Sequence, residues 1–190
     1  MPWYTITDNF DKDFGVDEWH GAQRLLIDRL DPGRRGFDMW MLSIQGERKA
    51  QPLLQTKFSE QWGVVSPDGR WVAYQSEESG STEVYVQAFP SPGSRVQIST
   101  DGGFEPTWSR GGRELFYRTG DKMMVVSVET HSIFKAGMPK TLFEDHYDYS
   151  DFDVTPDSTP FLMIRAQNES APNQLTVVIN WLEDLKRARP

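Results

Sequence analysis

The sequence contains no cysteine. Disulfide bonds, thiolate chemistry and cysteine-ligated zinc or iron–sulfur sites are therefore excluded. This absence does not indicate a compartment, because a chain without thiols is compatible with both oxidising and reducing surroundings.

Long apolar runs are also missing. The longest, such as residues 175–182, are too short and too interrupted to cross a bilayer. Residues 1–5 lack the basic and apolar regions of a signal peptide. We therefore expect no membrane insertion and a soluble chain, cytoplasmic as written or extracytoplasmic if it is the tail of a membrane-anchored kinase. The compartment itself is left open.

Positive charge is scarce relative to negative charge. Lysine and arginine number 20 against 28 aspartates and glutamates, for a formal net charge of −8. Such a chain repels phosphate backbones and anionic lipids, so nucleic acid and membrane surfaces are excluded as expected partners. The apolar content, 37% with 13% aromatic, suffices for one core in a single domain.

Several catalytic motifs are absent as well. The sequence has no Gly-x-Ser-x-Gly elbow, phosphate-binding loop, dinucleotide fingerprint or His-Glu-x-x-His helix. Each of these chemistries depends on its spacing, so we expect no enzyme of those classes and no cofactor.

A turn motif recurs with a period in the forties. It has the sequence Ser-Pro-Asp-Gly at residues 66–69, Ser-Arg-Gly-Gly at 109–112 and Thr-Pro-Asp-Ser at 155–158. With a degenerate copy at His20, successive copies start 46, 43 and 46 residues apart. Such periods, together with short strands, are typical of a four-stranded propeller blade.

The residues of this motif suit a tight turn. Proline presets φ for the first corner, aspartate caps the turn through its side chain, and glycine accepts positive φ. An aromatic-rich strand follows each copy, which predicts the inner hairpin of a blade. The predicted turn residues are Ser66, Pro67, Asp68, Gly69, Ser109, Gly111, Gly112, Thr155, Pro156 and Asp157.

The predicted fold is therefore an all-β, partial or small β-propeller of about four four-stranded antiparallel blades. It forms one domain over 1–190, and a short helix ends it at 180–187. An unclosed run of blades exposes apolar faces, so we expect ring closure by residues 3–7 or self-association. The predicted blades are 14–56, 60–99, 104–143 and 149–180.

Two segments carry a resemblance to a known family. Residues 66–70 and the aromatic strand after them resemble the TolB-type, WD-like propeller repeat of bacteria. Residues 175–186 are similar to the end of propeller regions that follow eukaryotic-like serine/threonine kinase domains in some soil bacteria. The resemblance covers about residues 18–187. It implies a ligand- or protein-binding propeller, often of about six to eight blades.

The sequence departs from that family in three ways. It has no kinase motif or membrane span, and it holds only about four units. In the first unit, Gly-Ala-Gln at residues 21–23 stands in place of the Pro-Asp-Gly turn. Upstream blades could complete such a ring.

Candidate metal ligands are few. Residues 144–153 hold five carboxylates and one histidine, and Asp148, Asp151 and Asp153 are the candidates for a hard cation such as calcium. Without a fixed loop spacing and glycine, we prefer the interpretation of a solvated inter-blade loop. Residues 8–15 faintly suggest a calcium loop but lack its glycine and glutamate at the required positions, and we interpret them as an acidic surface loop. The three histidines, His20, His131 and His146, are expected at turns or on the surface.

The preferred function is a non-catalytic scaffold for protein or small-ligand binding, as the sensor part of a kinase-linked receptor or alone. The alternative is an enzyme with a carboxylate site at the propeller channel mouth. Its candidates, Asp17, Glu60, Glu105 and Asp151, precede the turns at similar offsets. The competing interpretation is that these acids bind loop backbone.

Overall fold

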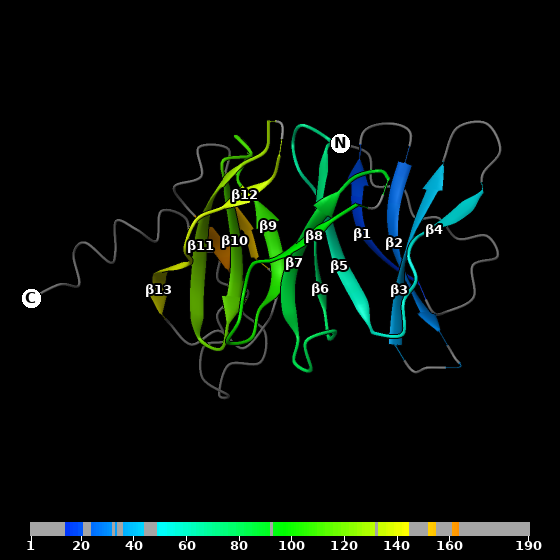
Figure 1. Ribbon diagram of the computed structural model, residues 1–190, viewed down its shortest axis with the longest axis horizontal. Helices are drawn as coiled ribbons and strands as arrows, with labels where there is room; N and C mark the ends of the chain where they lie inside the picture. The colour runs from blue at the N-terminus through cyan, green and yellow to red at the C-terminus, as the bar shows by residue number, and fades with distance from the viewer. Residues whose placement is uncertain are drawn as a thin grey trace, which may run out of the picture.

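Short antiparallel strands make up the described part of the chain, which contains no helix (Figure 1). The computed structural model describes residues 14–20, 24–31, 33, 36–43, 49–91, 93–131, 133–144, 152–154 and 161–163. The predicted helix over 180–187 and the predicted strand at 3–7 lie outside these residues.

The first two sheets, blade 1 and blade 2, are four-stranded meanders in chain order. Blade 1 contains β1 (Phe14–His20), β2 (Arg24–Asp31), β3 (Gly36–Ser43) and β4 (Ala50–Leu54). Blade 2 contains β5 (Glu60–Val65), β6 (Trp71–Ser76), β7 (Glu83–Ala88) and β8 (Arg95–Gln97).

Blade 3 has a split outer edge. It contains β9 (Phe104–Trp108), β10 (Glu114–Thr119), β11 (Lys122–Glu129), β12 (Lys135–Ala136) and β13 (Lys140–Glu144). Both β12 and β13 pair with β11. The break falls at Gly137–Pro139, where Gly137 still donates its N–H to the Ser127 carbonyl at 2.8 Å but Pro139 has no N–H to donate. The sequence had predicted a single outer strand here.

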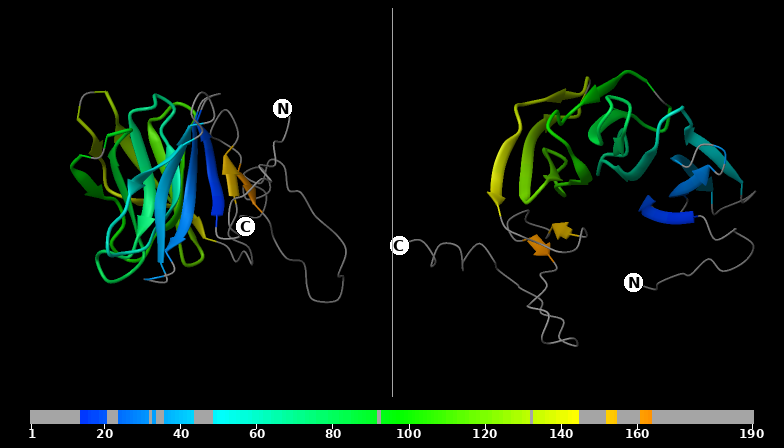
Figure 2. Two further views of the ribbon diagram at one scale, coloured as in Figure 1. Left: turned by 90° about the vertical axis from the view of Figure 1, so that its right-hand side faces the viewer. Right: turned by 90° about the horizontal axis from the view of Figure 1, so that it is seen from below.

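Blade 4 is described only as the hairpin of β14 (Phe152–Val154) and β15 (Phe161–Met163). The sheets follow one another around a common axis with β1, β5 and β9 toward the inside (Figure 2). The described strands form an arc that is open between β1 and the β14–β15 hairpin. This is the all-β partial propeller that the repeat predicted.

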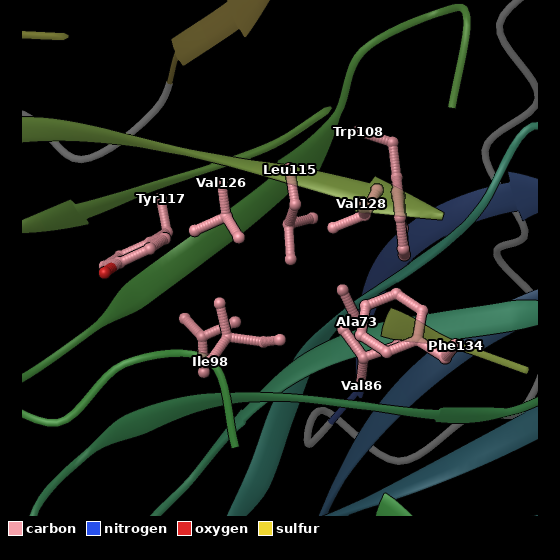
Figure 3. Packing of buried hydrophobic residues seen from close by; sticks show 10 residues of the cluster. Ala73, Val86, Ile98, Trp108, Leu115, Tyr117, Val126, Val128 and Phe134 are labelled. Atoms are coloured by element: carbon pink, nitrogen blue, oxygen red, sulfur yellow. The ribbon is translucent and has the colours of Figure 1, made fainter. Parts of the chain in front are cut away.

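Apolar side chains pack between neighbouring blades. Figure 3 shows the cluster between blades 2 and 3, where Val86 and Ile98 face Leu115 and Val126. Between blades 3 and 4, Phe161 meets the Phe116 ring edge-on, with centroids 5.0 Å apart. Aliphatic and aromatic side chains together therefore join blade to blade, as a propeller requires.

Candidate binding groove

The predicted turns of blades 2 and 3 have the same hydrogen bonds. In blade 2, Gly69 donates its N–H to the Ser66 carbonyl at 2.8 Å and has a φ of 70°. In blade 3, Gly112 donates to the Ser109 carbonyl at 2.9 Å with a φ of 63°. Both serine hydroxyls also accept an N–H from the strand that follows. These residues therefore shape the hairpins.

Asp68 belongs to the same turn. Its carboxylate accepts the Ser66 hydroxyl at 2.6 Å and the Arg70 N–H at 3.2 Å. Partial burial opposes ionisation, but these bonds outweigh it and hold the pKa of Asp68 below its usual 3.8.

Other predicted site residues lie partly or wholly outside the described part. Thr155, Pro156, Asp157, Asp148 and Asp151 are all outside it. Asp153 lies on β14 opposite Leu162, and Asp17 lies on β1, and their side chains are not described. No group of three or more metal-ligating side chains occurs among the described residues.

The other two candidate catalytic acids are buried. Glu60 is fully buried at the start of β5, where its carboxylate accepts the Thr56 hydroxyl. Glu105 on β9 is 8% exposed, and its carboxylate lies 3.7 Å from the Arg118 guanidinium of β10. The described geometry ties both acids to structural partners.

Glu105 also marks a repeated backbone feature. It has a φ of 56°, and Trp62, the equivalent residue 43 positions earlier on β5, has a φ of 59°. The Trp62 N–H donates to the Asp28 carboxylate at 2.9 Å, and the Glu105 N–H donates to the Gln75 side chain at 3.2 Å. In both cases a second-strand side chain of one blade holds the bulged inner strand of the next.

A second recurring device fastens the linkers between blades. Glu83, at the start of β7, is 1% exposed, and its carboxylate accepts the Gly102 N–H at 2.9 Å and the hydroxyls of Ser81 and Ser99. Asp38, the third residue of β3, accepts the Gln55 side chain at 3.1 Å. Sequence reasoning missed both acids, although each one lies at or near the start of a third strand.

The linker that Glu83 fastens forms one wall of a groove at the end of blade 3. The groove has a volume of about 630 Å³, within the range of small-ligand sites. Its walls come from the β8–β9 linker (100–102), the β10–β11 hairpin (117–124) and β13 with the residue before it (139–144). These segments are remote in sequence and form no local motif, so sequence reasoning missed the groove.

Tyr117 forms the inner wall of this groove and is 3% exposed. Figure 3 shows its ring leading away from Leu115 and Val126, with the hydroxyl at the outer end. Burial and the carboxylates of Glu83 and Asp101 raise the pKa of Tyr117 to about 12. The phenol is therefore a neutral hydroxyl near pH 7.

Strand order, blade-to-blade packing and the repeated turns define the class of fold as a partial β-propeller. Two solved TolB structures are similar to this chain, one of them described as TolB from Agrobacterium tumefaciens, with a TM-score of 0.51 and 17% identity. The other, TolB from Acinetobacter baumannii, has a TM-score of 0.56 and 14% identity. At such identities the similarity shows the fold alone.

The aligned portion covers 65% and 77% of this chain, but only 46% and 36% of the two TolB chains. This chain therefore spans less than half of either one. The sequence matches no protein-family model and no curated protein. Within the described residues, no helix has the length and apolar character that crossing a membrane requires.

Proposed function

We propose that this chain is a non-catalytic binding scaffold whose groove at the end of blade 3 receives part of a partner. The observation that carries the proposal is the groove itself, where a linker, a hairpin and the edge strand β13 meet on a tightly packed sheet framework. In propellers, the rigid blades hold connecting segments of this kind in place, and those segments bind ligands.

The burial of Glu60 and Glu105 favours this scaffold over the carboxylate enzyme. A general acid or base has to come within hydrogen-bond reach of its substrate. Both side chains instead lie inside the sheets against structural partners, Thr56 and Arg118. The similarity to TolB propellers supports the framework and leaves the partner open.

Further blades would complete the ring in this proposal. The described strands form an open arc, and they align with only part of the TolB chains. The additional blades come from a preceding part of a longer protein or from a second copy. A kinase domain encoded in frame upstream would support a sensor role, and an upstream frame without one would contradict it.

Site-specific photo-crosslinking tests the scaffold. A photoreactive amino acid replaces Lys122 at the groove rim or, as a matched control, Lys135 on β12; both lysines are exposed. In extract of the source organism we expect a discrete crosslinked partner from position 122 and none from position 135. The same pattern from both positions, or no product from 122, would contradict the proposal.

A further inference from the structure

We infer that the groove recognises a protonated amine or guanidinium group. The Tyr117 hydroxyl on the inner wall would accept a hydrogen bond from this group, and the acidic side chains around the groove would attract its charge. This inference rests on the proposed binding function and names the chemistry of its ligand. Free small cations and basic side chains of a partner protein share that chemistry.

The first observation is the sign of the charge around the groove. Asp101, Asp121 and Glu144 line it, and Lys122 is the one basic side chain among its described lining residues. Lys122 lies opposite Glu144 in the β11–β13 register, where neighbouring charges of opposite sign attract each other. By formal charge the described lining side chains are negative, with three carboxylates against one ammonium group, and the chain's net charge of −8 has the same sign.

The second observation is independent of the acidic side chains. Tyr117 is almost wholly buried, yet its hydroxyl has no hydrogen bond within the described part of the chain. The hydroxyl oxygen itself is not among the buried polar atoms that lack a partner, so it reaches the open space of the groove that Tyr117 lines. A ligand placed there can take the place of water as the hydrogen-bond partner of this hydroxyl.

The two features suit one kind of ligand. Asp101 lies close enough to act electrostatically on the Tyr117 phenol, so a ligand on that hydroxyl is within the field of the carboxylate. A cation gains from that field, whereas an anion is repelled. The backbone near Asp101 is also held in place, because its carbonyl accepts the Thr119 hydroxyl at 2.9 Å.

The test uses the ¹⁵N-labelled full chain and two probes of nearly equal shape. N-acetyl-arginine amide carries the charge, and N-acetyl-citrulline amide lacks it. The reporters are the backbone amides of Gly102 and Gly120, both in the groove wall. We expect saturable shifts of both amides with the arginine probe, and binding about five-fold weaker or more with citrulline.

Variants assign the effect to the groove. Asp101→Asn should weaken arginine binding about three- to five-fold, and Tyr117→Phe about three- to ten-fold. Glu129→Gln is the matched control, because it removes an exposed carboxylate from the far end of β11, about 23 Å from Lys122 at the usual rise per residue. It should leave binding unchanged. Asp101 is exposed, so the Asn variant remains informative even if Tyr117→Phe perturbs the fold.

A five-residue peptide with a central arginine separates the two sources. Tighter binding of the peptide at the same amides favours a protein partner, and equal binding favours a free cation; both outcomes support the inference. Equal binding of citrulline and arginine, unmoved glycine amides, or unchanged affinity in both groove variants would overturn it. If position 122 crosslinks to a partner but citrulline binds as tightly as arginine, the proposed binding function stands and the inference of cation recognition is rejected.

Discussion

At the scale of single residues, Glu83 shows how a buried charge can hold a junction between blades. Its carboxylate accepts three hydrogen bonds, from Ser81, Ser99 and the backbone of Gly102. Two of these donors lie in the segment that leads from blade 2 into blade 3. The acid therefore ties this linker, and with it one wall of the groove, to the start of β7.

Replacing Glu83 should loosen this junction. Glu83→Ala leaves buried donors without their acceptor, so we expect the free energy of unfolding to fall by about 2–3 kcal/mol. Urea denaturation followed by tryptophan fluorescence measures it. Glu129→Ala is the control, because Glu129 and its Lys135 partner are about 70% exposed, and its effect should stay within about 0.5 kcal/mol. Equal losses in both variants would contradict the assigned role.

Asp68 makes the blade 2 turn sensitive to pH. Its folded pKa lies below the usual 3.8, so its charge stabilises the fold above that value. The contribution is lost as the pH falls through the lower, folded pKa. We expect Asp68→Asn to be less stable than wild type at pH 7, and the difference to shrink on acidification below 3.8. A difference that grows at low pH would contradict this sign.

At the scale of elements, the inner strands share a bulge whose centre adopts left-handed backbone. Trp62 and Glu105 have φ values of 59° and 56°, which bulky residues rarely adopt. The conformation turns each N–H toward the preceding blade, where Asp28 or Gln75 accepts it. Blade-to-blade contact thus depends on backbone hydrogen bonds as well as apolar packing.

Two substitutions at Trp62 separate the backbone effect from the loss of the indole. Trp62→Asn and Trp62→Val both remove the ring, but asparagine tolerates left-handed φ and a β-branched side chain does not. We expect the Asn variant to be more stable by about 1–2 kcal/mol in urea denaturation. If the Val variant is as stable as the Asn variant or more so, the left-handed backbone at position 62 does not limit stability.

The turns and strands could be predicted because their signals are local. Ser66 to Gly69 specify a turn by their own chemistry, and the 43-residue repeat to Ser109 places the next one. The bulges could not be predicted, since Trp62 and Glu105 share no residue type. The split outer edge depends on Gly137 and Pro139, whose effect appears only when β11 lies beside them.

At the scale of the whole molecule, the blades form an arc in which each sheet packs against the next. Trp108 of β9 donates its indole N–H to the Val64 carbonyl of β5 at 3.0 Å. Trp71 of β6 donates in the same way to Thr130, beyond β11, also at 3.0 Å. Phe134 packs against both indoles, with centroids 5.3 Å and 6.3 Å away.

The candidate site exists only at this scale. Its walls come from segments around Asp101, Tyr117 and Thr141, and no spacing in the sequence brings them together. The sequence instead suggested acids at similar offsets before the turns. Two of them, Glu60 and Glu105, are internal supports of the sheets. The repeated turns made the blades predictable from the sequence. The groove was not predictable, because the segments that line it lie outside the repeated turns.

Nuclear Overhauser effects from the tryptophan indoles test the propeller arrangement most directly. In the full chain, the Trp108 indole proton should show contacts to Val64, and the Trp71 indole proton to Thr130. These contacts join residues of different blades, 44 and 59 positions apart in sequence. Indole contacts confined to neighbours within a single sheet, with none between β5 and β9, would contradict the propeller.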